Sequence, residues 1–352
     1  MTQSKAYSDA GVDIDAGERF ADMIKALVAK AWGSGDEIGG FAGGGPIPLK
    51  VRKVAGSVDG TGTKAILAAL ANNHDGIGID AVAMGAVDMY VAGYSPAFAL
   101  DVLNVAALVP NRHIQVIESV IRGCQMCGCR LIGGETAELP DMFPANWMFN
   151  LDVTVIGFDN PDAGEALPVE PGQLVLGWNS NGVASNGFSL VRKIFGFKGP
   201  DWRPVREMLA CEYDQLDGEP ISRHLLRPTP IWIPNVETQK LRGVEFSRHA
   251  HITGGGLPGN IPRILPPHCR VMLDRSAWTR PPIFRLIQDR GGLADEEMDP
   301  VFNQGIMMVS LVPRDGVQCN DPNARVIGMV QHREGNEPQV KLVNRFPDDC
   351  GD

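Results

Sequence analysis

The sequence predicts a mixed α/β protein of two domains, each built from a sheet packed with helices. Three observations point to this fold class. The chain has 352 residues, roughly twice the usual size of one domain. Segments with helical spacing of apolar residues are interspersed with strand-like segments along its length. A stretch rich in proline, glycine and acidic residues, 160–173, separates two regular halves, so we expect domains at 1–165 and 166–352.

The first half should open with a helix at 15–32, where apolar side chains share one face and Asp15 with Glu18 resembles a capping box. A glycine-rich loop at 39–45 follows. The next elements expected are strands at 51–58, 96–105 and 130–132 and helices at 63–71, 80–92 and 111–126. The alternation of apolar and polar residues at 149–158 then predicts a strand.

The second half restarts with a strand at 174–178, and a helix should begin near Gly187. We expect 199–220 to be irregular. The segment 230–241 predicts a helix, because proline is favoured near a helix start. The remaining elements expected are a short helical segment at 257–265, a helix at 282–289, strands at 306–312, 325–330 and 340–343, and a loose acidic tail at 346–352.

The composition restricts the partners that the protein can have. The net charge of −10 argues against binding to a nucleic-acid duplex, because phosphate binding needs a positive face. No apolar run of about 18 residues is present, so we expect no membrane-spanning helix. An anionic ligand must therefore be held locally, by backbone N–H groups, a few cationic side chains or a metal.

The seven cysteines, an odd number in a long chain, indicate free thiols and a cytoplasmic location. Cys124, Cys127 and Cys129 are close enough in sequence to suggest a metal or redox site. However, no second Cys or His pair stands at zinc-finger spacing. We therefore favour the interpretation that these three are small buried side chains at the end of a helix.

The strand at 51–58 runs into a candidate phosphate-binding segment. Its residues are Asp59, Gly60, Thr61, Gly62, Thr63 and Lys64. Backbone N–H groups between a strand and a helix can bind phosphate, and glycines permit close approach. The segment lacks the Walker A spacing. Asp59 supplies the hard oxygen that Mg²⁺ takes together with nucleotide phosphates. A tight polar turn capped by Asp59 would explain the same pattern.

Two further carboxylates are candidate metal ligands. Asp88 interrupts an apolar helix, where a carboxylate must be paired, bound to a metal or at the surface. Glu135 follows the short strand 130–132 and two glycines, at the strand end where ligands of α/β sheets usually bind. Asp59, Asp88 and Glu135 could form one Mg–nucleotide site. The alternative for Asp88 is a position facing solvent.

The second half contains two more candidate ligand segments. Ser185 and Asn186 precede a helix whose N-terminus could bind an anion, although they could also act only as its caps. His251 could act as an acid, a base or a positioning group, or be a structural histidine. Three glycines that permit close contact with a ligand follow it: Gly254, Gly255 and Gly256.

In this order the motifs resemble the phosphoribosylformylglycinamidine cyclo-ligase family, also called the aminoimidazole ribonucleotide synthetases. The most specific segment is 7–17, which reads YSDAGVDIDAG. The other matching segments are 59–64, 78–80, 133–138, 185–193, 251–256, 260–263 and 302–303. Together they extend over nearly the whole chain.

The resemblance implies two α/β domains, of which the first binds ATP and forms a homodimer and the second completes the active site. ATP, with Mg²⁺, would phosphorylate the formyl amide oxygen of formylglycinamidine ribonucleotide. An amidine-side nitrogen would then close the imidazole ring, giving aminoimidazole ribonucleotide, ADP and phosphate. The resemblance assigns catalysis to Asp88, Glu135 and His251. It assigns ATP binding to residues 59–64, Ser185, Asn186 and the glycines at 254–256.

Two residues depart from the family pattern. Ala184 stands where the family usually has histidine, and Met307 where it usually has glycine. Both lie in or near the segments expected to handle the substrate, whereas the three acidic motifs are intact. Two alternatives to an active cyclo-ligase are therefore another ATP-using member of the wider superfamily and a non-catalytic nucleotide-binding paralogue.

Overall fold

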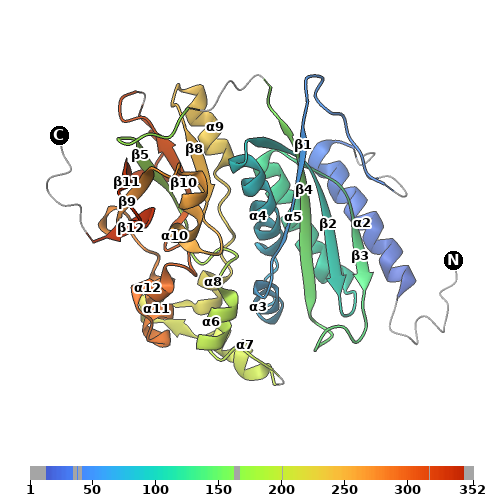
Figure 1. Cartoon of the computed structure of the whole chain (residues 1–352). Coiled ribbons are helices and arrows are strands. Elements are labelled where there is room, and N and C mark those ends of the chain that lie inside the picture. The colour runs from blue at the N-terminus through green and yellow to red at the C-terminus, as the bar shows by residue number, and fades with distance from the viewer. Residues whose placement is uncertain are drawn as a thin grey trace. The chain divides into compact units, whose positions relative to one another are not determined.

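The computed structural model describes residues 13–34, 38, 42–161, 167–199, 201–316 and 318–344 (Figure 1). The chain divides into two compact units, and both combine helices with a sheet, which confirms the fold class. The first unit contains Met1–Pro161, Lys198–Cys211 and Pro220–Ile231. The second contains Asp162–Phe197, Glu212–Glu219 and Trp232–Asp352. The acidic tail, residues 39–41 of the glycine-rich loop and the segment before residue 13 lie outside the described residues.

The first unit is built on a four-stranded sheet with the strand order β1-β4-β2-β3. Its strands are β1 (Val54–Gly60), β4 (Phe149–Asp159), β2 (Tyr94–Val105) and β3 (Arg130–Glu138). β4 is antiparallel to β1 and β2, whereas β2 and β3 are parallel. Leu151, Val153 and Val155 alternate with less buried residues along β4, so one face of the sheet belongs to the core.

Helices cover that face, as Figure 1 shows for α4 (Ile77–Val91) and α5 (Pro110–Cys127). The interfaces are tight enough to require glycine. A Cβ atom at Gly85 of α4 would lie 3.0 Å from the side chain of Val155, and one at Gly78 would lie 2.2 Å from the backbone nitrogen of Val120 on α5. The other helices of this unit are α2 (Ile14–Trp32), α3 (Lys64–Leu70), α7 (Arg203–Leu209) and α8 (Ile221–Leu225).

Two local predictions in the first unit are wrong. The cap of α2 is Asp13 rather than Asp15, because the Asp13 side chain accepts a hydrogen bond from the Ala16 nitrogen at 2.9 Å. The strand expected at 130–132 continues to Glu138, because β3 pairs with β2 along its whole length. Glu135 therefore lies within a strand and not after its end. A break in the register at Leu100 shows that the pairing accommodates an irregularity next to the two glycines.

The second unit contains a six-stranded sheet with the order β12-β9-β11-β5-β10-β8. Adjacent strands in this sheet are antiparallel, except that β12 and β9 are parallel to each other. The strands are β5 (Leu174–Asn179), β8 (Arg248–His251), β9 (Cys269–Asp274), β10 (Ile306–Val312), β11 (Ala324–His332) and β12 (Val340–Val343). The helices are α6 (Phe188–Ile194), α9 (Ile233–Leu241), α10 (Gly256–Asn260), α11 (Pro282–Gly291) and α12 (Asp295–Met298).

Short elements account for most of the remaining differences from the expected structure. β8 and β9 were not expected, and α7 lies inside the segment expected to be irregular. The hairpin-like pair β6 (Glu212–Tyr213) and β7 (Glu219–Pro220) also falls there. Cys124, Cys127 and Cys129 are buried free thiols, as favoured from the sequence. The first two lie in the last turns of α5, and Cys129 directly precedes β3. None of the described helices is long and apolar enough to span a membrane.

Candidate functional site

The candidate phosphate-binding segment ends in a buried ion pair. Nζ of Lys64 lies 2.6 Å from Oδ2 of Asp80 on α4, and both side chains are almost fully buried. The backbone nitrogen and hydroxyl of Thr229 donate to the other carboxylate oxygen at 2.8 and 2.7 Å. Lys64 also donates to the Arg227 carbonyl oxygen at 2.8 Å. Burial lowers the pKa of Lys64 and raises the pKa of Asp80, while the ion pair opposes both shifts.

Residues within the segment 59–64 therefore differ in their access to solvent. The Lys64 ammonium is held inside the first unit, so in this conformation it does not face solvent. Asp59 and Gly62 are exposed, and Gly62 has a positive φ of 49° with no atoms near its Cβ position. The exposed part of the turn is therefore the part that can approach a ligand.

The structure does not bring Asp59, Asp88 and Glu135 together within one chain. Asp59 and Glu135 lie on β1 and β3, the two edges of the sheet, three strand spacings or about 14 Å apart. The end of α4 that carries Asp88 lies over Gly157, which pairs with Ala55, four residues along β1 from Asp59. Among the described residues, no group of three His, Cys, Asp or Glu side chains could hold a metal ion.

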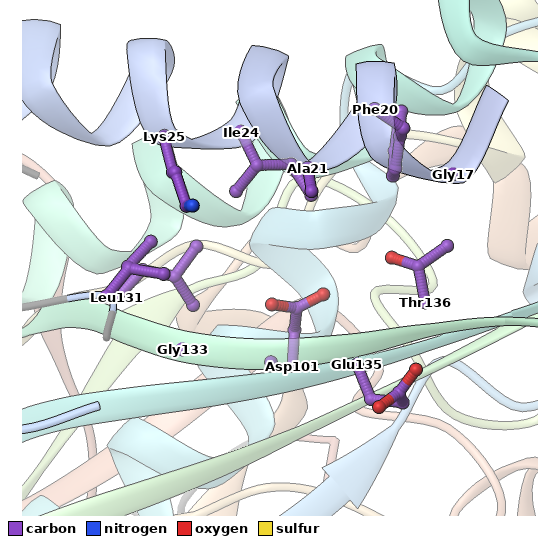
Figure 2. A pocket seen from close by; sticks show the side chains of 12 residues that line it. Gly17, Phe20, Ala21, Ile24, Lys25, Asp101, Leu131, Gly133, Glu135 and Thr136 are labelled. Carbon is purple, nitrogen blue, oxygen red and sulfur yellow. The ribbon is translucent and has the colours of Figure 1, made fainter. Parts of the chain in front are cut away.

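A cavity of about 290 Å³ lies between α2 and strands β2 and β3 (Figure 2). Its walls are mostly apolar side chains and the backbone of three glycines. The lining residues are Gly17, Phe20, Ala21, Ile24, Lys25, Ile38, Asp101, Leu131, Gly133, Gly134, Glu135 and Thr136. The cavity thus combines the start of the first helix with the Gly-Gly-Glu motif that the sequence singled out.

Asp101 is the carboxylate that points into this cavity. Figure 2 shows its side chain directed from β2 toward α2, whereas Glu135 points to the other side of the sheet. This follows from the register, in which Asp101 pairs with Gly134 and Val102 pairs with Glu135. Asp101 is only 4% exposed. Burial raises its pKa to about 7, and the negative charge of Glu135 contributes to the increase.

Glu138 holds the helix that roofs the cavity. Its carboxylate accepts hydrogen bonds from the backbone nitrogen of Asp13, at the start of α2, and from that of Leu108, at 2.7 and 2.6 Å. The last residue of the motif 133–138 therefore has a structural role, because it ties α2 to the sheet. The sequence did not indicate this role, since the two partners are backbone groups.

In the second unit, segments far apart in the sequence meet around the glycines at 254–256. A Cβ atom at Gly254 would lie 3.8 Å from Oδ1 of Asn186. Nδ2 of Asn260 donates to the carbonyl oxygens of Gly256 and Gly254 at 2.8 and 3.2 Å. Gly256 has a positive φ of 58°, and a Cβ atom there would lie 1.8 Å from the Asp299 carbonyl oxygen. Only glycine therefore fits this turn.

The segment that contains Ser185 and Asn186 packs against the segment 302–305. A Cβ atom at Gly187 would lie 2.4 Å from the Phe302 ring. Nδ2 of Asn303 donates to the carbonyl oxygens of Gly182 and Val183 at 3.0 and 3.3 Å. The structure thus gathers three of the motif segments, those around 185–187, 251–256 and 302–303, in one region of the second unit.

The two histidines of the fifth motif have different surroundings. His249 is a core residue whose Nδ1 lies 2.7 Å from Oγ of Ser310, which also accepts a hydrogen bond from the Trp178 indole at 2.9 Å. Burial lowers the His249 pKa to about 3, so this ring is neutral. His251 is 4% exposed and ends β8 directly before the glycine turn. Of the two, it is the one next to the candidate ligand segment.

The two residues that depart from the family pattern are also buried. Ala184 is 1% exposed and has a positive φ of 61°, a backbone conformation that is uncommon for alanine. Met307 is 1% exposed within β10. Both side chains therefore belong to the packing around the loops of the second unit, and neither supplies a polar group there.

Comparison with known proteins gives the same architecture. Two family models match, the N-terminal domain of AIR synthase related proteins over residues 47–158 and the C-terminal domain over 170–341. A crystal structure of the hydrogenase maturation protein HypE in complex with ATP has a TM-score of 0.57 at 17% identity, covering 88% of this chain and 86% of that one. Thiamine-monophosphate kinase from Stenotrophomonas maltophilia has a TM-score of 0.59 at 16% identity, covering 91% and 94%. At these identities the likeness concerns the fold.

Curated relatives are much more similar. The phosphoribosylformylglycinamidine cyclo-ligase of Bordetella pertussis is 39% identical over 334 residues, which covers 94% of this chain and 93% of the relative. The enzyme of the same name from Synechococcus is 38% identical over 342 residues, covering 96% and 94%. This similarity includes both units. The chain belongs to the phosphoribosylformylglycinamidine cyclo-ligase family.

Proposed function

We propose that this chain catalyses the ATP-dependent ring closure of formylglycinamidine ribonucleotide to aminoimidazole ribonucleotide, with release of ADP and phosphate, in purine biosynthesis. The observation that carries the proposal is the match to the cyclo-ligases over 94% of this chain and 93% of the relative. Two features support it: Gly133, Gly134 and Glu135 line the cavity beneath α2, and Gly254 is exposed in the turn after His251.

The reaction needs two things from the protein. The formyl oxygen must become a good leaving group, and the amidine nitrogen must approach the formyl carbon with its lone pair available. Bound Mg–ATP supplies the phosphoryl group and neutralises charge, so that the protein acts mainly by positioning its ligands and handling protons. His251, beside a turn that only glycine fits, is our candidate for an acid–base or positioning group of this reaction.

We also propose that Mg²⁺ enters together with ATP. The donors on this chain fit that mode, since Mg²⁺ is usually held by one or two carboxylates together with nucleotide phosphates. Asp59 is exposed beside the open turn at Gly62, so it is our first candidate ligand. Asp88 and Glu135 complete the proposed set, although within one chain they lie apart from Asp59.

A homodimer in the cytoplasm is the proposed form of the enzyme. The face of the sheet opposite the helices exposes Val54, Val58 and Val102, at 66%, 67% and 37% of their surface. Exposed apolar groups on a sheet whose edge strand is β1 favour association with another copy. The free thiols among the described cysteines suit a reducing compartment. Light scattering on Val58→Glu should show a shift from dimer to monomer.

The test of function is a product assay on the purified protein with formylglycinamidine ribonucleotide and Mg–ATP. We expect equal amounts of aminoimidazole ribonucleotide and ADP. Asp59→Asn, Asp88→Asn and Glu135→Gln should each lower turnover strongly while the protein stays folded, because each removes a charge at nearly constant volume. Tight ATP binding without ring-closed product would overturn the proposal, and rescue by Ala184→His would then identify a degenerate paralogue.

A further inference from the structure

One stretch of backbone, residues 299–303, lies under the glycine turn of the second unit. The backbone nitrogen of Gly255 donates to the carbonyl oxygen of Pro300 at 3.0 Å. The carbonyl oxygen of Asp299 lies directly against Gly256, because a Cβ atom there would be only 1.8 Å from it. The glycine turn therefore cannot shift unless this stretch shifts with it.

The same stretch, which we call the floor segment, also supports the other candidate ligand segment, 185–187. The ring of Phe302 packs against Gly187, where a Cβ atom would lie 2.4 Å from it. The side-chain amide of Asn303 donates to two backbone carbonyl oxygens just before this ligand segment. The floor segment is therefore shared by both ligand segments, and its position determines theirs.

An ion pair holds the start of the floor segment. Nη1 of Arg275 donates to Oδ1 of Asp299 at 3.0 Å, and Nη2 donates to Oδ2, so the guanidinium meets both carboxylate oxygens. Asp299 is 7% exposed, and the hydrogen bonds to it raise the pKa of Arg275. Contact at two points fixes the orientation of the two planar groups as well as their distance. Because Arg275 directly follows β9, the pair ties the floor segment to an inner strand of the sheet.

The other end of the floor segment is held at Gln304. The indole nitrogen of Trp278 donates to the Gln304 carbonyl oxygen at 2.9 Å. Gln304 has a positive φ of 53°, a conformation that costs free energy in a residue with a side chain and persists only where the surroundings impose it. The short stretch 275–278 thus grips the backbone on both sides of the floor segment.

We propose that Arg275 and Asp299 are positioning residues for ring closure: their ion pair fixes the floor segment, and the floor segment fixes both ligand segments. The inference rests on the proposed function, and it assigns neither residue a contact with a substrate. A misplacement of about 1 Å can cost roughly 100-fold in rate, even when the altered residue is far from the reacting atoms. Arg275→Lys keeps the charge and loses the planar fork, so this variant separates geometry from charge.

The first experiment measures steady-state ring closure by Arg275→Lys. The matched control is Arg285→Lys, which alters an exposed pair with Asp289 on α11. We expect kcat/KM per folded molecule to fall roughly 10- to 100-fold in Arg275→Lys and to keep the wild-type value in Arg285→Lys. Circular dichroism gives the folded fraction. A loss no larger than the unfolded fraction, or no loss, would overturn the inference.

A double-mutant cycle then tests whether the two residues act through each other. Asp299→Asn keeps the volume of the side chain and removes its charge. We expect the variant with both Arg275→Lys and Asp299→Asn to lose about as much kcat/KM as the more affected single variant. Losses that multiply would show two independent effects and would contradict the proposal.

The second experiment needs no substrate, so it separates this inference from the proposed function. NMR follows amide hydrogen exchange in the ligand-free protein at Gly255, which is bonded to the floor segment, and at Ile252, which donates to the Met307 carbonyl oxygen at 2.9 Å. In Arg275→Lys, exchange at Gly255 should become roughly tenfold faster, and exchange at Ile252 should not change. Equal changes at both amides, or none, would sink the inference. If only Gly255 responds and the wild type forms no product, the proposed function fails and the positioning of the glycine turn by the ion pair stands.

Discussion

Replacing Asp101 with asparagine should remove a pH dependence from the stability of the ligand-free protein. Asp101 is 4% exposed, and burial raises its pKa from 3.8 to about 7. Between these two values the folded chain binds a proton that the unfolded chain does not. The free energy of unfolding therefore falls as the pH rises through this window, by about 1.4 kcal/mol per pH unit. Below the window this group contributes no pH dependence, and above it the loss is complete.

The change in the free energy of unfolding depends on how much of the pH range between 3.8 and about 7 the experiment covers. From pH 5 to pH 8 the wild type should lose about 2.7 kcal/mol through Asp101, and Asp101→Asn should not. The difference between variant and wild type should therefore grow by about that amount between pH 5 and pH 8. Taking this difference cancels any effect of the substitution on packing that does not depend on pH.

Urea denaturation at one protein concentration, without ligands, measures this difference. Asp22→Asn, at an exposed position on α2, is the control and should differ from the wild type by the same amount at every pH. If the stability curves of Asp101→Asn and the wild type run parallel from pH 5 to pH 8, Asp101 has an ordinary pKa. The conclusion that burial raises the pKa of Asp101 would then be refuted.

Three further outcomes are expected. Lys64→Met should lower the free energy of unfolding by about 3–5 kcal/mol in urea denaturation, because it leaves the Asp80 charge buried alone, and adding Asp80→Asn should recover part of the loss. His251→Ala should lower turnover roughly 100-fold, whereas His249→Ala should mainly lower the melting temperature; equal losses of turnover would indicate one structural role. Gly134→Ala should lower the melting temperature, since its Cβ would lie 2.2 Å from Oδ1 of Asp101 and 2.7 Å from the Asp101 backbone oxygen.

The long amphipathic elements could be predicted because their own side chains determine them. The helix α2 and the strand β4 each present a regular apolar face, and both lie close to the expected positions. β8 reads Arg-His-Ala-His, which has little strand preference of its own. Its pairing with β10 makes it a strand, and such pairing cannot be seen in a short polar segment.

In the candidate site, too, the sequence revealed local motifs but not contacts between distant residues. Asp59, Glu135 and the glycines at 254–256 were found because their motifs are local. Asp101 was missed although a signal existed, since it takes an inward position in the alternating run from Ala99 to Val105. The Lys64–Asp80 pair could not be found, because it depends on the packing of α3 with α4 and on Thr229, 149 residues beyond Asp80.

That separation has a consequence for how the protein is made. The charged groups of Asp80 and Lys64 leave the ribosome long before Thr229 and Arg227, which complete their hydrogen bonds. At translation rates of about 5–20 residues per second, the gap of 149 residues lasts roughly 7 to 30 s. During that time the emerging N-terminal half holds an ion pair that lacks the partners needed to bury it. The first unit therefore completes its interior only after Asp162–Phe197 and Glu212–Glu219 of the second have been synthesised, and a fragment that ends at residue 165 would never do so.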